Sequence, residues 1–361
     1  MHSPSSITDW FDARAFDGDI SRQYEAVVDD GLALIDRSDR DLLVLSGDDT
    51  IPWLQGLVTS ELHDLVDPGS GQRSAVVNTT GRFIAEARLL HIPQLLLMDL
   101  EPGLLDDALR SHLNNHIIME KVTLDDRSDH TARIGVYGRH THDLLGQLGN
   151  WSTDPEDIPP FHGAWTRWRG EDLIAHHSPW MEAPGLEIIC AAGVAPDLLE
   201  HLEHLFDGDR MPTFGHQAFE VLRIEAGIPR HGVELDDRVI PLEATFDDAI
   251  DYDKGCYLGQ EIIARLDTLG TPAKLLRKVH LDTPVAPEPD TDVLPEDGEG
   301  RAIGSVKSSI FSPQSGCAVA MAFIKRGHND IGHTVRIGDQ LGTLAPLTNF
   351  QDPSTPDGAT A

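Results

Sequence analysis

The sequence has few cysteines, few basic residues and no long apolar run. Its 3 cysteines, Cys190, Cys256 and Cys317, form no Cys-x-x-Cys pair, which excludes a cysteine-rich zinc site and a disulfide framework. No stretch approaches the roughly 18 uninterrupted apolar residues of a membrane helix. The N-terminus also lacks a basic start followed by an apolar run. We therefore expect a cytoplasmic protein with no membrane contact.

Basic side chains are scarce relative to acidic ones. The chain carries 60 Asp and Glu against 28 Lys and Arg, with a formal net charge of −32. The acidic residues are spread along the chain, so we interpret the excess as halophilic adaptation to a salt-rich cytoplasm, where self-repulsion is screened. An acidic surface for a basic partner is the alternative, and it would concentrate the charge in one run. The same negative field disfavours direct nucleic-acid binding.

The 361 residues exceed the usual length of one domain, so we expect two or three packed units. The apolar stretch at 75–78, the turn at 79–82 and the following strand to 91 predict a β-hairpin. Pro102 marks the first turn of a helix that continues through Ile117. These segments indicate mixed α and β structure.

The pattern changes after Thr271. Short apolar stretches alternate with glycine turns, as in a small β-barrel or sandwich. The proline-rich, acidic segment 284–300 is expected to be an exposed loop of this last unit.

Upstream, His201 and His204 lie three residues apart on a predicted helix. Because no third ligand is evident, we predict no metal site.

Two neighbouring blocks have the strongest signal in the chain. One runs from Arg223 to Leu235, and the other reads Lys254-Gly-Cys-Tyr-Leu-Gly-Gln-Glu261. Together they resemble the YgfZ family, whose hallmark is Lys-Gly-Cys-Tyr-x-Gly-Gln-Glu, within the wider superfamily of the glycine-cleavage T-protein. Further segments fall in family order, namely 54–59, Asn78 with Gly81-Arg82, 222–229, 241–243 and 304–323.

The resemblance covers nearly the whole chain and carries an expected fold. It implies an α+β, T-protein-like architecture in which interleaved α/β lobes surround a central folate cavity. A C-terminal β-barrel follows. We accordingly expect a folate-binding body at 1–271, built from two interleaved α+β subdomains, and a barrel domain at 272–361.

The resemblance also implies a ligand, which is tetrahydrofolate or a one-carbon derivative of it. Glu225 matches the family glutamate that grips the pterin ring, and a carboxylate suits the adjacent ring N–H and amine donors. Without the resemblance, a helical Glu is usually solvent-facing or ion-paired. Asn78, Tyr257 and Arg277 are the other folate-binding candidates, and Arg277 falls where T-proteins have a basic residue near the folate tail.

Cys256 is the characteristic residue of the family motif and our first candidate for function. Lys254 lies two residues before it, a spacing that places a cation near a thiol on a tight turn, where the thiolate is favoured. The alternative is a small buried Cys beside a solvated Lys.

Glu86 lies where T-proteins have an aspartate near the reactive folate nitrogen. The side chain here is one methylene longer, which puts aminomethyl transfer in doubt because acid–base chemistry depends on placement. Strand alternation would place Glu86 and Arg88 on one face, so a surface ion pair is the alternative.

The leading hypothesis is a folate-binding protein that supports the assembly or repair of iron–sulfur enzymes, with transient contacts to those client enzymes. A lone Cys cannot hold a cluster by itself. The rival hypothesis is a tetrahydrofolate-dependent aminomethyltransferase, or a related demethylase, that uses Glu86. A scaffold that has lost its ligand is a third possibility.

Overall fold

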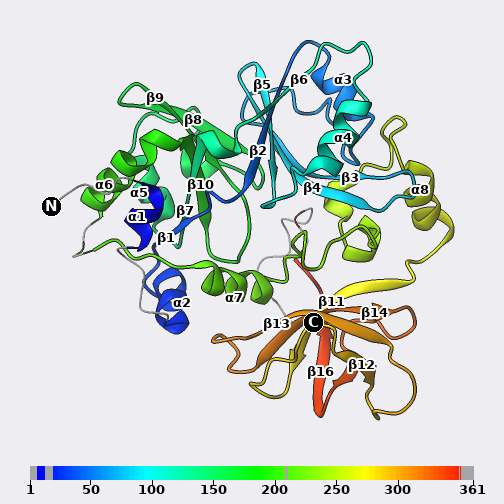
Figure 1. The fold of residues 1–361 in the computed structure, drawn as a ribbon. Coiled ribbons are helices and arrows are strands. Elements are labelled where there is room, and N and C mark those ends of the chain that lie inside the picture. The colour runs from blue at the N-terminus through cyan, green and yellow to red at the C-terminus, as the bar shows by residue number, and fades with distance from the viewer. Residues whose placement is uncertain (1–5, 13–18, 207, 209, 349, 351–361) are drawn as a thin grey trace. The chain divides into compact units, whose positions relative to one another are not determined.

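The computed structural model describes residues 6–12, 19–206, 208, 210–348 and 350 as a mixed α/β chain (Figure 1). Two compact units alternate along the sequence. The first takes in the described residues up to Leu54, then Leu62–Arg73 and Ala87–Leu222. The second takes in Gln55–Glu61, Ser74–Glu86 and the described residues from Arg223 onward. The units are therefore interleaved in sequence.

Two five-stranded sheets precede the barrel. One has the order β1-β7-β10-β9-β8 and the other β3-β4-β5-β2-β6. Their strands are β1 (Ala33–Asp36), β2 (Asp41–Ser46), β3 (Gly71–Val77), β4 (Phe83–Ile92), β5 (Leu95–Leu100), β6 (Thr123–Asp126), β7 (Thr131–Tyr137), β8 (Gly163–Trp168), β9 (Glu171–His176) and β10 (Gly185–Ala191). The helices are α1 (Ile7–Asp12), α2 (Ile20–Val28), α3 (Thr50–Gln55), α4 (Asp107–Asn115), α5 (Thr141–Gly146), α6 (Ala195–Leu205), α7 (His216–Ala226) and α8 (Gln260–Leu269).

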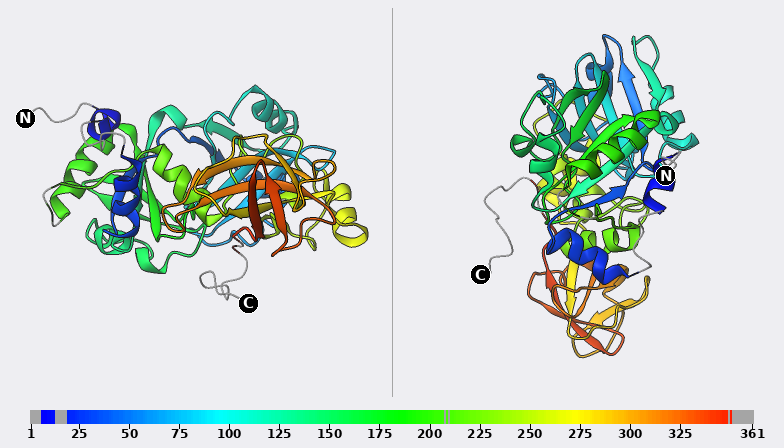
Figure 2. Two further views of the ribbon diagram at one scale, coloured as in Figure 1. Left: turned by 90° about the horizontal axis from the view of Figure 1, so that it is seen from below. Right: turned by 90° about the vertical axis from the view of Figure 1, so that its left-hand side faces the viewer.

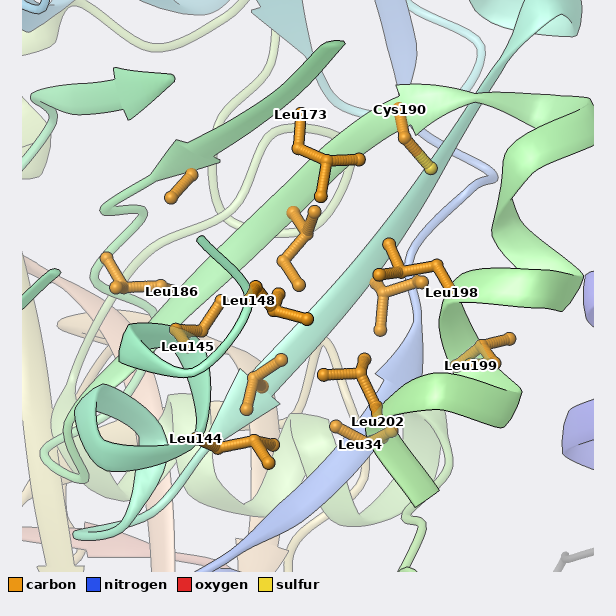
Figure 3. Packing of buried hydrophobic residues seen from close by; sticks show 14 of the residues in the cluster. Leu34, Leu144, Leu145, Leu148, Leu173, Leu186, Cys190, Leu198, Leu199 and Leu202 are labelled. Atoms are coloured by element: carbon orange, nitrogen blue, oxygen red, sulfur yellow. The ribbon is translucent and has the colours of Figure 1, made fainter. Parts of the chain in front are cut away.

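The first sheet packs one face against α5 and α6. Leu198 and Leu202 of α6 point toward the strands, and Leu144 and Leu145 of α5 close the same core (Figure 3). Because α6 presents its leucines three and four residues apart, one helical stripe can cover the sheet. Cys190 belongs to this core, and burial raises the pKa of its thiol to about 12. Its side chain therefore contributes to the packing of the core.

The predicted hairpin is present as β3 and β4, with Asn78 at its turn. The predicted helix near Pro102 is present but begins later than expected, because Asp106 caps it by accepting the N–H of Leu109 at 2.9 Å. A side-chain cap of this kind fixes where a helix begins. Pro102 lies in the preceding turn.

The tail forms a closed barrel of order β11-β14-β13-β12-β15-β16, drawn from yellow to red in Figures 1 and 2. The segment 284–300 is not only an exposed loop. It contains β12, whose Val293 is fully buried in the barrel core. The division between 271 and 272 stays a prediction. The strands are β11 (Lys274–Leu281), β12 (Asp292–Pro295), β13 (Gly304–Phe311), β14 (Ala318–Lys325), β15 (Thr334–Ile337) and β16 (Gln340–Ala345).

Candidate functional site

Lys254 is buried at the start of the Lys-Gly-Cys-Tyr turn. Its Nζ donates to three backbone carbonyl oxygens, those of Gln55 at 2.9 Å, Val58 at 2.8 Å and Ser60 at 2.6 Å. Burial lowers the pKa of Lys254 to about 8. An ammonium has three donors, so these carbonyls engage all of them.

Cys256 follows on the same turn and carries an exposed, free thiol. The next residue, Tyr257, is buried, and its ring centroid lies 5.1 Å from the Nζ of Lys254. Burial raises the pKa of Tyr257 to about 12, so its phenol stays protonated. The turn therefore places Lys254 and Tyr257 inward and Cys256 outward.

Asn78 builds the hairpin turn beside this motif. Its Oδ1 accepts the N–H groups of Thr80 at 2.8 Å and Arg82 at 3.2 Å. A Cβ added to Gly259 of the motif would lie 2.5 Å from the backbone oxygen of Asn78. The structure thus brings the motif and the hairpin turn into direct backbone contact.

Glu86 is 3% exposed, so a surface ion pair with Arg88 is excluded. The expected surface location was wrong because both faces of β4 are covered along this stretch. Arg88 is buried as well, with its guanidinium 3.5 Å from the ring centroid of Trp180.

Glu225 lies near the end of α7 and is 8% exposed. Its Oε1 accepts the hydroxyl of Ser312 and, at 3.4 Å, the N–H of Gln314. Its backbone oxygen accepts the Nζ of Lys278 at 2.9 Å. These contacts tie Glu225 to the barrel, whereas those of Lys254 tie the motif to Gln55–Ser60.

Arg277 on β11 is half-buried. Its Nε donates to the backbone oxygen of Asn329 at 2.8 Å, and burial lowers the pKa of its guanidinium. Among the sequence-predicted residues, the structure therefore groups Lys254, Cys256 and Tyr257 on one turn next to Asn78. Glu225 and Arg277 have separate contacts with the barrel.

A buried ion pair beside Glu225 escaped the sequence analysis. Arg223 and Glu234 are both fully inaccessible and are joined by two hydrogen bonds of 3.1 and 3.3 Å. Ser308 of the barrel donates to the same carboxylate. Arg223 and Glu234 both belong to the block from 223 to 235. The resemblance of that block to the family was therefore the signal that could have identified the pair.

The first unit holds a larger buried ionic cluster that the sequence analysis also missed. Arg133 contacts Asp99 at 2.7 Å and Glu187 at 3.0 Å, and the hydroxyl of Tyr137 donates to Glu187 at 3.1 Å. Burial alone would raise the pKa values of both carboxyls, but the neighbouring arginines hold them below their ordinary values. Arg37, Arg40 and Glu101 also belong to the cluster.

Perturbed ionisable groups of this kind concentrate at functional sites, so the cluster is a second candidate region. A separate cavity of about 210 Å³ in the first unit is lined by Phe11, Gln23, Asp36, Phe214 and neighbouring residues. It contains none of the predicted site residues.

Across the described ranges, no three His, Cys, Asp or Glu side chains are placed to hold a metal ion. The same ranges contain no helix that is long and apolar enough to cross a membrane.

Comparison with known proteins gives two domain matches. The GCVT N-terminal domain matches residues 5–254, and the glycine cleavage T-protein C-terminal barrel domain matches residues 274–353. An aminomethyltransferase of Staphylococcus carnosus is 24% identical over 311 residues, covering 85% of this chain and 82% of that protein. One from Saccharopolyspora erythraea is 29% identical over 224 residues, covering 62% and 59%.

The crystal structure of the aminomethyltransferase T from Bartonella henselae has the same fold. It superposes with a TM-score of 0.79 at 17% identity, over 92% of this chain and 89% of that one. The matched domains span both five-stranded sheets and the closed barrel described above. On this evidence the chain belongs to the glycine cleavage T-protein family.

Proposed function

We propose that this protein binds tetrahydrofolate, or a one-carbon derivative, and supports the assembly or repair of iron–sulfur enzymes. Aminomethyltransferases of its family use tetrahydrofolate, which supports the folate part. The Lys-Gly-Cys-Tyr-Leu-Gly-Gln-Glu segment, with its resemblance to the YgfZ family, supports the iron–sulfur part. Any contact with a client enzyme would be transient, because one thiol cannot hold a cluster alone.

The observation that carries the proposal is an exposed thiol on an anchored turn. Cys256 is exposed, whereas Lys254 before it is buried on three carbonyls and Leu258 after it donates to Gly56 O at 3.0 Å. A thiol held this way keeps a defined position at the surface. A client protein could therefore reach it without unfolding the turn.

The residues proposed for folate are Glu225, Asn78, Tyr257 and Arg277. Ser312 and Gln314 both donate to Oε1 of Glu225. Because a carboxylate has about four lone-pair sites, Oε2 can accept an N–H of the ligand. A paired contact with two ring donors would require Oε1 to share or release Ser312.

Calorimetric titration with tetrahydrofolate at molar salt tests the folate part. We expect binding by the parent protein, loss of binding in Glu225→Ala, and retention in Glu220→Ala on the same helix. Absence of binding by the parent would favour the scaffold hypothesis. If Glu225→Ala binds tetrahydrofolate as the parent does, the proposed pterin contact of Glu225 is refuted.

Replacement of the motif cysteine tests the iron–sulfur part. Cys256→Ser should impair rescue of iron–sulfur enzyme activity in cells that lack this protein, at unchanged protein level. Cys317→Ser, which removes the partly exposed barrel thiol, is the matched control. Equal rescue by both variants would remove Cys256 from the function.

A second candidate is aminomethyl transfer, which the names of the relatives favour. Here Glu86 would act as the acid–base group. Glu86→Gln should then slow the formation of methylene-tetrahydrofolate from an aminomethylated carrier protein. An unmodified protein without that activity rules the candidate out.

We also propose that the protein works in a salt-rich cytoplasm, on the strength of its net charge of −32. Mutual repulsion among surface carboxylates weakens as the Debye length falls from about 10 Å at 0.1 M to about 3 Å at 1 M salt. The melting temperature should therefore rise across this range. A melting temperature independent of salt would contradict the proposal.

A further inference from the structure

The ammonium of Lys254 has no donor left for the neighbouring thiol. Its three hydrogens are directed at the carbonyls of Gln55, Val58 and Ser60, at 2.9, 2.8 and 2.6 Å. The thiol of Cys256 is exposed while Lys254 is buried. A lysine that donated a hydrogen bond to the thiolate would need one of these three donors for the sulfur.

The carbonyls that accept from Lys254 belong to residues 55–60, and this segment makes further hydrogen bonds to the turn. The N–H of Asp251 donates to Thr59 O at 3.0 Å, and the N–H of Leu258 donates to Gly56 O at 3.0 Å. The hydroxyl of Thr59 donates to Ala249 O at 2.5 Å. We call this set of contacts between 249–258 and 55–60 the seam. All of its residues belong to the second unit.

Lys254 is the only charged side chain described in the seam that donates to several carbonyls at once. Buried carbonyl groups need hydrogen-bond partners, and without Lys254 these three would lose one each. The contacts of Asp251, Leu258 and Thr59 would remain. Cys256 lies between Lys254 and Leu258, so its backbone position depends on both anchors.

We infer that Lys254 is a positioning residue that fixes the Cys256 turn on residues 55–60, and that it is not the charge partner of the thiol. The importance of this position rests on the proposed function, in which Cys256 meets a client. The contacts themselves do not depend on that function. A turn that loses Lys254 keeps its thiol but no longer presents it in one place.

The first measurement is amide hydrogen exchange at Asp251 and Leu258, whose N–H groups lie in the seam. In Lys254→Met we expect exchange at both to rise about tenfold or more, because local opening controls protection. Barrel amides of β14 should be unchanged. Lys121→Met, which removes an exposed lysine paired with Asp48 at 3.5 Å, is the control and should alter neither amide. Parent-like exchange in Lys254→Met overturns the inference.

A nitroxide attached to Cys256 distinguishes positioning from a general structural role. The label should be ordered in the parent and mobile in Lys254→Met, whereas a label on Cys317 should give the same spectrum in both. Mobility gained equally at the two labels would mean general loosening and would overturn the inference.

The pH profile of Cys256 alkylation distinguishes positioning from charge pairing. Its midpoint should be the same in the parent and Lys254→Met. A nearby cation shifts a pKa by roughly 1–3 units, so a midpoint raised by about one unit would assign Lys254 to the thiolate and overturn the inference.

Lys254→Arg keeps the proposal testable if Lys254→Met does not fold. Arginine retains the charge, but its planar fork does not match three converging carbonyls, so exchange in the seam should again rise. Parent-like exchange would overturn the inference. These readouts use neither folate nor a client, so equal rescue by Cys256→Ser would refute the proposed function and leave the seam result standing.

Discussion

The hydroxyl of Ser312 donates a hydrogen bond to Oε1 of Glu225 and so joins α7 to the barrel. Removing one partner of a buried hydrogen bond costs about 1–3 kcal/mol. Ser312→Ala should therefore lower the free energy of unfolding by about 1–2 kcal/mol, measured by urea denaturation. Ser305→Ala removes a 3.4 Å contact to a neutral carbonyl of the same barrel and should have a smaller effect.

The same substitution bears on the proposed folate contact. If Glu225 binds the pterin ring, Ser312→Ala removes one of the two donors on Oε1 and leaves the N–H of Gln314 at 3.4 Å. The substitution should then tighten tetrahydrofolate binding by about tenfold, the equivalent of about 1.4 kcal/mol. Calorimetry on the two proteins measures the ratio. An affinity that falls in step with stability would show that Glu225 serves only to join the helix to the barrel.

Glu187 should be among the most sensitive acidic positions in the first unit. It is fully buried against Arg133, Arg37 and Tyr137, so Glu187→Gln leaves guanidinium charge without compensation. We expect a loss of about 3–5 kcal/mol in urea denaturation. Asp172→Asn, in an exposed pair with Arg167 at 2.9 Å, should cost about 0–1 kcal/mol. Comparable losses would mean that the buried pair is not ionised.

His176 should make the protein sensitive to mild acid. Burial lowers the pKa of His176 from 6.5 to about 4. Between these values the unfolded chain binds a proton that the folded chain does not, so stability falls as the pH falls through this window. The carboxyls of Asp99 and Glu187 stay ionised there, because their pKa values are lowered.

From pH 7 to pH 5 the His176 contribution amounts to about 2 kcal/mol. Urea denaturation at both pH values should show that loss in the parent and a reduced loss in His176→Gln. His328→Gln, at an exposed position, serves as the control and should keep the parent's dependence. An undiminished loss in His176→Gln would assign the acid sensitivity to other groups.

The sequence could predict those helices and strands whose apolar residues recur at regular intervals. Leu198 and Leu202 mark one face of α6, and the glycine-punctuated strands after Thr271 indicate the barrel. On β10, Leu186, Ile188 and Cys190 face the core, and alternation turns Glu187 to the opposite face. The period alone cannot say that this second face is also covered, so a charged residue there was passed over.

The site residues show a similar limit. The motif spacing brings a cation near a thiol, but it says nothing of the three carbonyls that lie 194, 196 and 199 residues earlier in the chain. Those carbonyls compete for Lys254 and engage its donors. In the same way, the apolar spacing of α7 identifies a helix, but the partner of Glu225 comes from a barrel hairpin 87 residues later. Non-local partners decide what each side chain does.

The two glycines of the motif should differ sharply in their tolerance of a side chain. Gly259 has φ of +82°, and an added Cβ would lie 2.5 Å from Asn78 O and 3.1 Å from Gly81 Cα. A residue other than glycine in the left-handed region costs about 1–3 kcal/mol, and the backbone collision adds to that. Gly255 has open space around it and no positive φ.

Gly259→Ala should therefore lower the free energy of unfolding by at least about 2 kcal/mol, whereas Gly255→Ala should change it by less than about 0.5 kcal/mol. Urea denaturation of the two variants measures both changes. Because Gly259 packs on the hairpin turn, Gly259→Ala should also raise amide exchange at Gly81, whose N–H donates to Asn78 O at 2.9 Å. Equal stability of the two variants would mean that the motif turn does not pack on Asn78, and the hairpin would then have no part in holding Cys256 in place.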